Sequence, residues 1–219
     1  MRAPISVVIP TLNAQAQLGE CLASLMPGVE AGLIRELIVS DGGSDDATVA
    51  VAKAWGAKVL TGAPSRGGQL MRGCDAAQGA WLMVLHADTR LQDGWVGPVI
   101  THLETHQAGW FRLAFVQGGL AGRVVSGWTY LRSRMGLPYG DQGLLLPHAL
   151  YGDVGGYPDQ PLMEDVALAR ALKGRLCAID AVAETTLARD HAQGWLRRGA
   201  RNFWALLRYF LGTSPDRLA

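Results

Sequence analysis

The sequence lacks long apolar runs, paired cysteines and an excess of charge of either sign, and each shortage excludes a class of protein. No stretch approaches the roughly eighteen uncharged apolar residues of a membrane-spanning helix. Cys21, Cys74 and Cys177 are odd in number, widely spaced and form no CxxC pair, so neither a disulfide framework nor a zinc knuckle is indicated. The net charge of +1 gives no general attraction to nucleic acid, and we expect no nucleic-acid partner.

The N-terminal sequence MRAPISVVIP is unlike a secretory signal, because its apolar run is short, ends at Pro10 and lacks a small-residue cleavage site. Together with the unpaired cysteines, this predicts a cytoplasmic protein. Apolar sequence is plentiful: 49% of the 219 residues are hydrophobic and 18% are charged, which allows a sizeable core. There is no internal repeat and no linker, so we expect one domain over residues 1–219.

Strand and helix signals alternate along the first hundred residues, which predicts an α/β fold with a mostly parallel sheet. Pro27 is expected to stop the first helix. The second half is less regular, and "LMEDVALARALKG" is expected to be a helix that ends at Gly174. The expected strands are 5–10, 36–41, 58–61, 80–85, 109–116 and 143–147, and the expected helices are 15–26, 47–55, 69–78, 120–135 and 162–174.

Short polar clusters follow three of the expected parallel strands. They begin at Thr11, at Asp41 and at His86. The carboxyl ends of parallel strands meet at one edge of a sheet, where ligands of such folds bind. We therefore expect a polar ligand to lie across this edge.

The cluster "HADT" has two chemical interpretations beside that of an ordinary loop. An aspartyl phosphatase needs an aspartate nucleophile where His86 stands, so that chemistry is missing. The other interpretation is a divalent cation held against a diphosphate, because Mg²⁺ is often bound by one carboxylate with phosphate oxygens completing its shell. Asp88 is the candidate carboxylate, and His86 would suit Mn²⁺ better than Mg²⁺.

Three further motifs contain candidate binding and catalytic residues. Asp41, at a strand end, can accept hydrogen bonds from a base or a ribose, and Arg66 in "PSRGGQL" can contact a base or a phosphate. In "MEDVALARAL", Asp165 is a candidate general base with Glu164 as its neighbour. The plain alternative for the motif that contains Asp41 is a glycine turn followed by a capped helix. The plain alternative for the motif that contains Asp165 is an acidic helix start.

The motifs "SVVIPTLNAQAQL", "ELIVSDGGSDDAT", "SRGGQL", "HADT" and "GGYPDQPLMED" occur in the order and rough spacing found in family 2 glycosyltransferases. The resemblance covers about Ile5 to Leu172, and it is greatest to the small, stand-alone bacterial type with a "YGDQG" segment, here Tyr139 to Gly143. It implies the GT-A, or nucleotide-diphospho-sugar transferase, fold: a mostly parallel central sheet flanked by helices. We add a C-terminal amphipathic helix to this expectation.

The resemblance also implies an inverting transfer from a UDP- or GDP-sugar, assisted by Mn²⁺ or Mg²⁺, with Asp165 as the base that deprotonates an acceptor hydroxyl. "HADT" matches the family's Asp-x-Asp motif, with Asp88 on the cation and His86 in place of the first aspartate, where it would contact the ribose. The residues implied to contact the nucleotide are Pro10, Thr11, Asn13, Asp41, Arg66 and His86.

Residues on the acceptor side are less well marked. Asp141 and Gln142 are candidates for acceptor binding, or else form a polar turn. His191 follows the acidic motif by one strand, where some family members place a metal or phosphate ligand; the alternative is a solvated side chain. We expect a nucleotide-binding half over 1–90, an acceptor half over 91–190 and a helical segment over 191–219.

The segment from Gly194 to Leu211 is dense in aromatic and basic residues at helical spacing. Such a helix can lie on an anionic membrane, can cap the domain with its apolar face, or can form a homodimer. Membrane contact would place the protein on the inner face of the cell membrane, near a lipid or lipid-linked sugar acceptor. Two rival functions remain, a sugar nucleotidyltransferase and an inactive nucleotide-binding scaffold. The nucleotidyltransferase is disfavoured because its glycine-rich loop usually follows the first strand, and here no glycine occurs before Gly19.

Overall fold

The computed structural model describes most of the first 186 residues and a few positions beyond them. His191 and most of the expected helices 120–135 and 194–211 lie outside the described residues, so these expectations stay predictions. Within the described part of the chain, no helix is long and apolar enough to cross a membrane. The described residues are 3–116, 126–127, 129–130, 132–133, 138, 140–186, 204, 206, 208–209 and 213–215.

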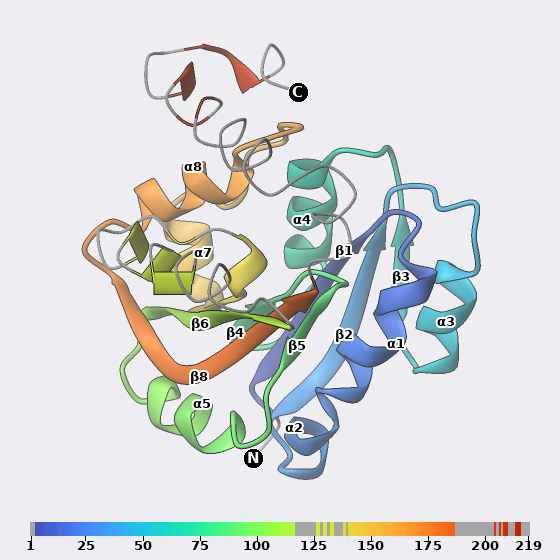
Figure 1. The fold of residues 1–219 in the computed structure, drawn as a ribbon, viewed down its shortest axis with the longest axis horizontal. Helices are drawn as coiled ribbons and strands as arrows, with labels where there is room; N and C mark the ends of the chain where they lie inside the picture. The colour runs from blue at the N-terminus through green and yellow to red at the C-terminus, as the bar shows by residue number, and fades with distance from the viewer. Residues whose placement is uncertain are drawn as a thin grey trace.

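All strands of the described residues join one eight-stranded sheet in the order β3-β2-β1-β4-β7-β6-β8-β5 (Figure 1). The first four strands in this order are parallel to one another. Strand β7 is antiparallel to both β4 and β6, β6 and β8 are parallel, and β5 is antiparallel to β8. The strands are β1 (Ile5–Thr11), β2 (Ile34–Asp41), β3 (Lys58–Thr61), β4 (Trp81–Val84), β5 (Thr89–Leu91), β6 (Ala108–Val116), β7 (Leu144–Pro147) and β8 (Leu176–Thr186).

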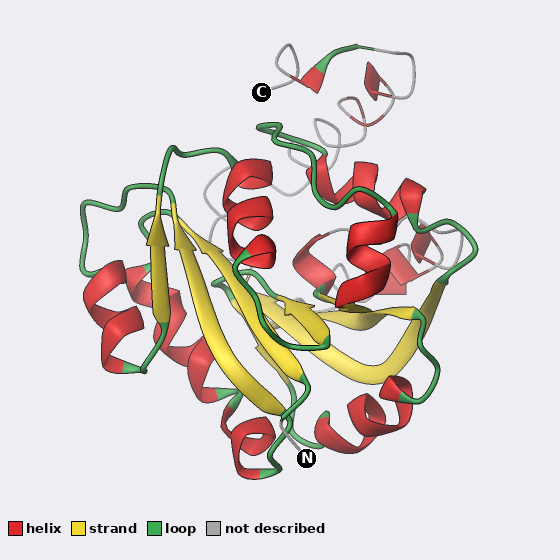
Figure 2. Cartoon of the chain, turned by 180° about the vertical axis from the view of Figure 1, so that it is seen from behind, coloured by secondary structure: helices red, strands yellow, loops and turns green. Residues whose placement is uncertain are grey.

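Helices cover both faces of the sheet, as Figures 1 and 2 show. One layer contains α1 (Gln15–Ala23), α2 (Met26–Glu30), α3 (Thr48–Ala54) and α5 (Val96–Leu103), and the other contains α4 (Arg66–Asp75), α7 (His148–Asp153) and α8 (Glu164–Ala171). The α/β fold with a mostly parallel sheet is thereby confirmed.

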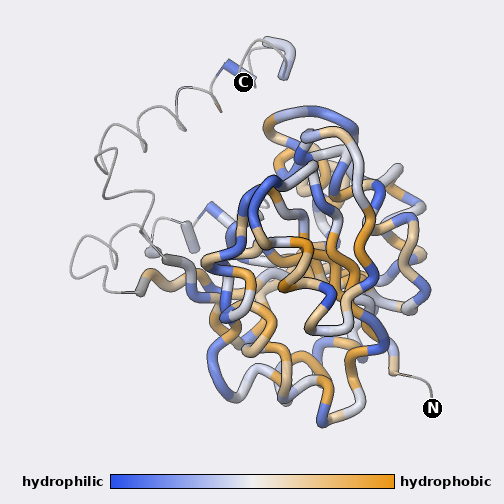
Figure 3. The backbone as a smooth tube through the Cα atoms, turned by 90° about the vertical axis from the view of Figure 1, so that its right-hand side faces the viewer, coloured by the Kyte–Doolittle hydropathy of each residue, from blue (hydrophilic) through white to orange (hydrophobic). Residues whose placement is uncertain are grey.

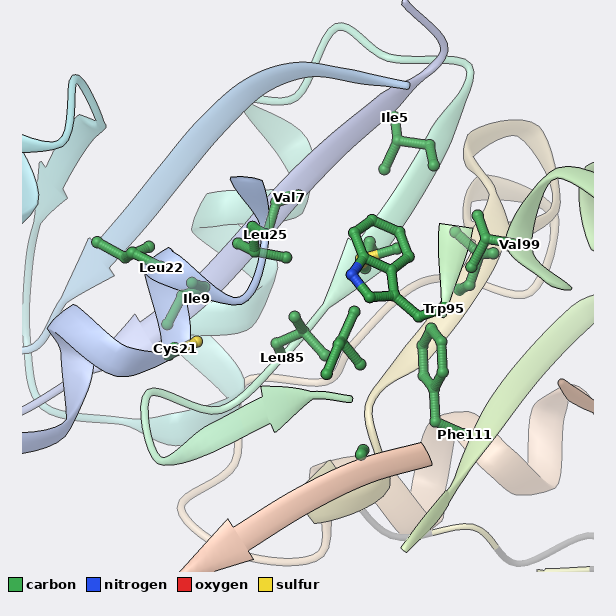
Figure 4. Close-up of a cluster of buried hydrophobic side chains, with 14 of the residues drawn as sticks. Ile5, Val7, Ile9, Cys21, Leu22, Leu25, Leu85, Trp95, Val99 and Phe111 are labelled. Atoms are coloured by element: carbon green, nitrogen blue, oxygen red, sulfur yellow. The ribbon is translucent and has the colours of Figure 1, made fainter. Parts of the chain in front are cut away.

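Alternation along the strands divides the core between these two layers. On β1, Ile5, Val7 and Ile9 pack under the first layer, whereas Val8 packs under the second. Figure 4 shows Trp95 among the aliphatic side chains of the first cluster, and Figure 3 shows hydrophobic stretches of the chain passing through the middle of the molecule. Burial of this apolar surface is the main favourable contribution to folding.

Several helix boundaries differ from the expected ones. The helix expected over 162–174 runs from Glu164 to Ala171 and ends before Gly174. The helix expected over 15–26 ends at Ala23, and Pro27 lies in the first turn of α2. Proline is tolerated there because the first turn of a helix leaves its N–H groups unpaired in any case. Helix α4 begins at Arg66, three residues earlier than expected, because the Ser65 side chain caps it by accepting a hydrogen bond from the Gly68 N–H.

Candidate functional site

The carboxyl ends of β1 and β2 are joined by a buried network around Asp41, which is 1% exposed. Its Oδ2 accepts hydrogen bonds from the N–H groups of Gly43 and Ser44, each at 2.8 Å. Its Oδ1 accepts from the hydroxyls of Ser44 at 2.6 Å and Thr11 at 2.9 Å. Burial raises the pKa of Asp41, but these hydrogen bonds outweigh burial and hold it below its usual value.

Asp41 therefore shapes the loop at the strand ends, and contact between Asp41 and a base stays a prediction. Asn13 lies in the same loop network in the left-handed region, at φ 51°. Its side-chain oxygen accepts from the Asp45 N–H at 3.0 Å, while the side chain remains exposed. Pro10 is partly exposed beside it, so Pro10, Thr11 and Asn13 lie at one edge of the sheet.

Asp41→Asn is expected to lower the free energy of unfolding by about 1–3 kcal/mol at pH 7, because the new amide nitrogen would face a hydrogen-bond donor. The folded pKa of Asp41 lies below its unfolded value, so its contribution is complete above the unfolded pKa and is lost as the pH falls through the folded pKa. Urea unfolding of both proteins should show a stability difference that narrows below about pH 4. A difference that stays constant down to pH 3 would contradict this role.

Arg66, the first residue of α4, connects two of the motifs. Its Nε is 3.0 Å from Oε1 of Glu164, and its Nη2 is 2.9 Å from Nε2 of His86. A guanidinium group has only donors, so the His86 Nε2 accepts and a neutral ring carries its proton on Nδ1. This nitrogen is closed to a cation while Arg66 holds it. The structure thus joins the end of β4 to the start of α8.

Three aspartates gather around this arginine. Burial raises the pKa of Asp141 to about 6; the positive charges of Arg132 and Arg66 oppose the rise, and the negative charges of Asp165 and Asp88 add to it. The charges of Asp88, Asp141 and Asp165 also act on Arg66, and interactions between charges fall off with distance. Asp88, Asp141 and Asp165 therefore share one region with Arg66, although they are far apart in the sequence.

The two acceptor candidates of the "YGDQG" segment differ in position. Asp141 Oδ1 is buried and has no hydrogen-bond partner among the described residues. Gln142 is fully buried: its Oε1 accepts from Ser133 Oγ at 2.7 Å, and its Nε2 donates to the Phe111 carbonyl at 3.3 Å. Gln142 thus has no surface open to an acceptor and instead anchors the turn that presents Asp141.

The adjacent acidic residues at the start of α8 also face different surroundings. Glu164 is 1% exposed, whereas Asp165 is partly exposed. Burial raises the pKa of Glu164 to about 7, opposed by Arg66 and reinforced by Asp165. The residue before them, Met163, is left-handed at φ 64°, an uncommon conformation for a non-glycine residue that no sequence signal predicts. Glu164 therefore lies in the interior, and Asp165 is the more accessible of the two carboxylates.

The donor set for a cation is a single carboxylate with further acidic groups close by. Among the described residues, no three His, Cys, Asp or Glu side chains are placed to hold a metal ion together. This excludes an all-protein cage in that part of the chain. The carboxylate of Asp88 fits a hydrated Mg²⁺ or Mn²⁺ whose shell is completed by phosphate oxygens.

The start of α4 is docked on the loop before α8, which sequence reasoning did not predict. Ser65 Oγ donates to Asp159 Oδ1 at 2.6 Å, and the Gly67 N–H donates to the Gln160 carbonyl at 3.1 Å. A Cβ on Gly67 would lie 2.1 Å from the Pro158 carbonyl oxygen. Only glycine permits this approach, so Gly67 of the motif "SRGGQL" allows the start of α4 to pack against the loop before α8.

Gly67→Ala is expected to destabilise the fold by about 1–3 kcal/mol, because backbone atoms at 2.1 Å must shift. Gly19→Ala is the matched control: a Cβ there meets nothing within 4 Å, and the exchange should stabilise α1 by up to about 1 kcal/mol. Urea unfolding of both variants measures the two effects. Equal effects of the same sign would contradict the close approach.

The geometry can be compared with known proteins. The family sequence model of glycosyl transferase family 2 matches residues 6–141 of this chain. A PGL/p-HBAD biosynthesis glycosyltransferase of Mycobacterium bovis is 36% identical over 108 residues, which cover 42% of this chain and 39% of that protein. Glucosyl-3-phosphoglycerate synthase of Mycobacterium tuberculosis is 36% identical over 111 residues, covering 44% of this chain and 34% of the synthase. The chain thus aligns with well under half the length of these curated relatives.

Solved structures agree with the fold over a longer stretch. The Mycobacterium tuberculosis synthase in complex with Mn²⁺, UDP and phosphoglyceric acid has a TM-score of 0.57 and 26% identity, covering 84% of this chain and 68% of that one. TarS of S. aureus in complex with UDP-GlcNAc has a TM-score of 0.65 and 17% identity, covering 84% of this chain and 58% of that one. At 17% identity, the likeness to TarS concerns the fold alone.

Proposed function

Because the chain belongs to glycosyl transferase family 2, we propose that it transfers a sugar from a nucleoside-diphosphate sugar to an acceptor hydroxyl, with inversion at the anomeric carbon. The observation that carries this proposal is the convergence of Arg66, Asp88, Asp141 and Asp165, from four separate motifs, at one edge of the sheet. Such a site combines the positive charge of Arg66 with several carboxylates. A diphosphate leaving group requires positive charge, and a hydroxyl nucleophile requires a base.

Asp165 is the general base of the proposed reaction. It takes the proton of the acceptor hydroxyl as that oxygen attacks the anomeric carbon, on the face opposite the diphosphate. The bond between the anomeric carbon and the diphosphate oxygen breaks in the same step, through a transition state with oxocarbenium character. The partial exposure of Asp165 supports this role, and the burial of Glu164 argues against that residue as the base.

The remaining residues bind the donor. Arg66 and the ring of His86 face the diphosphate and ribose, and Pro10, Thr11, Asn13 and Asp41 form the edge against which the nucleoside lies. Asp88 holds Mn²⁺ or Mg²⁺ against the diphosphate; this cation supplies positive charge that stabilises the departing group. The Mn²⁺ and UDP in the similar structure of the Mycobacterium tuberculosis synthase favour a UDP-sugar.

The acceptor is proposed only as a hydroxyl compound that reaches Asp141 and Asp165. The orphaned oxygen of Asp141 supports this, because a bound hydroxyl would donate to it. Three further proposals rest on sequence pattern alone: contact with a membrane, formation of a homodimer, and a role of His191 as a metal ligand.

A panel of UDP- and GDP-sugars incubated with the protein and Mn²⁺ tests the proposal. Slow hydrolysis of one donor, with water as acceptor, and a raised Tm in the presence of that donor are expected. Release of pyrophosphate from a nucleoside triphosphate and a sugar phosphate would favour the nucleotidyltransferase. A Tm shift with UDP but no turnover of any sugar nucleotide would favour the inactive scaffold.

A further inference from the structure

Glu164 is a buried acidic residue at the start of α8, directly beside the proposed base Asp165. Its side chain is 1% exposed and meets Arg66 at 3.0 Å. A buried carboxylate is costly unless a positive partner compensates it, so the pair holds α8 and α4 in one relative position.

We propose that Glu164 is a positioning residue that acts through Arg66: it fixes the first turn of α8, and with it the base Asp165, relative to the donor-binding turn at His86. This inference rests on the proposed function, because it assigns Glu164 a part in the same reaction. Glu164 touches neither the donor nor the acceptor.

The contacts around the ion pair support this role. Arg66 spans from Glu164 to His86, so one side chain touches both the helix of the base and the turn of the donor site. The neighbouring residues Ser65 and Gly67 hold the loop before α8 through Asp159 and Gln160. The backbone then turns through the left-handed Met163 directly into Glu164 and Asp165.

This arrangement separates the two carboxylates by function. The backbone N–H of Val166 donates to Asp165 Oδ1 at 2.7 Å, so the position of the base follows the first turn of α8. Displacement of a reacting group by about 1 Å can cost on the order of 100-fold in rate. Loss of the anchor should therefore slow the chemical step and leave donor affinity nearly unchanged.

The experiment uses the full chain with Glu164→Gln, alone and combined with Arg66→Met. The control is Glu36→Gln, a partly buried carboxylate that accepts from Ser6 Oγ and the Gln78 N–H at the opposite edge of the sheet. Hydrogen exchange of the Gly67 amide and of the first-turn amides of α8 is measured without ligand. The kcat and KM of UDP-glucose hydrolysis with Mn²⁺ are measured in parallel.

Glu164→Gln is expected to speed exchange at these amides on the order of tenfold and to leave α1 unchanged. It should lower kcat about 100-fold with KM within about threefold, and its effect should vanish in the Arg66→Met background, because the partner through which it acts is gone. Glu36→Gln should change none of these quantities.

Two results overturn the proposal: unchanged exchange at Gly67 and α8, or a loss of kcat that is absent or equally large in both backgrounds. If wild-type protein hydrolyses no sugar nucleotide, the proposed function fails separately. The exchange measurement then still decides whether Glu164 positions α8 through Arg66.

Discussion

Asp165→Asn is expected to lower sugar transfer, or donor hydrolysis where water is the acceptor, by about 10²–10⁴-fold. The amide cannot take the proton of the attacking hydroxyl, so the nucleophile stays weak. Donor binding should persist, because Arg66 and Asp88 are untouched. Steady-state kinetics should therefore show the loss in kcat, and calorimetry should give a Kd for UDP within about twofold of wild type.

Asp180→Asn is the control for this variant, since Asp180 is exposed and pairs with Arg112 on the sheet surface. Its activity should equal that of wild type, because exposed ion pairs contribute little. If Asp165→Asn retains activity near the native rate, another residue is the base, and Asp141 becomes the first alternative to examine.

Asp88→Asn is expected to remove the metal dependence of nucleotide binding while the fold stays intact. The amide of asparagine lacks the negative charge with which the Asp88 carboxylate attracts a divalent cation. Among the described residues, no set of three possible ligands could hold the cation in place of Asp88. Mn²⁺ should tighten UDP binding to wild type by about 10- to 100-fold and should have almost no effect on the variant. Calorimetry with and without Mn²⁺ measures both.

Asp93→Asn serves as the matched control, because Asp93 is an exposed aspartate in the loop that follows β5. It should bind UDP with the metal dependence of wild type. The same metal dependence in Asp88→Asn would exclude Asp88 as the ligand of the cation, and unchanged Tm of the variant would show that the fold is not the cause of any loss.

The parts of the fold that could be predicted are those with a local sequence pattern. The apolar segments that form β1, β2, β3 and β4 are bounded by turn residues and alternate with segments of helical periodicity. A mostly parallel sheet therefore followed from general rules. Elements β5, α5 and α7 were not predicted, because short segments give too weak a period. Pro27 was expected to stop the first helix, but it lies in the first turn of α2. A proline is tolerated at the start of a helix, so the sequence alone did not distinguish the two positions.

The candidate site shows the same division. Asp88, Arg66 and Asp165 were predicted from motifs at strand and helix ends, and the structure brings them together. The inward position of Gln142 and of Glu164 could not be predicted, since burial depends on which distant segment packs against a residue. The contact between Gly67 and the Pro158 carbonyl has the same origin: the glycine was visible in the sequence, but its partner was not.

We propose that a nucleoside diphosphate and a cation bind beside Asp88 at the carboxyl ends of β1, β2 and β4, with Asp165 within reach of the sugar. A crystal structure with UDP and Mn²⁺, with the manganese located by its anomalous signal, tests this most directly. The account predicts an anomalous peak about 2.0–2.3 Å from a carboxylate oxygen of Asp88, bridging to the diphosphate. A peak remote from Asp88, or UDP bound away from the ends of β1, β2 and β4, would contradict it.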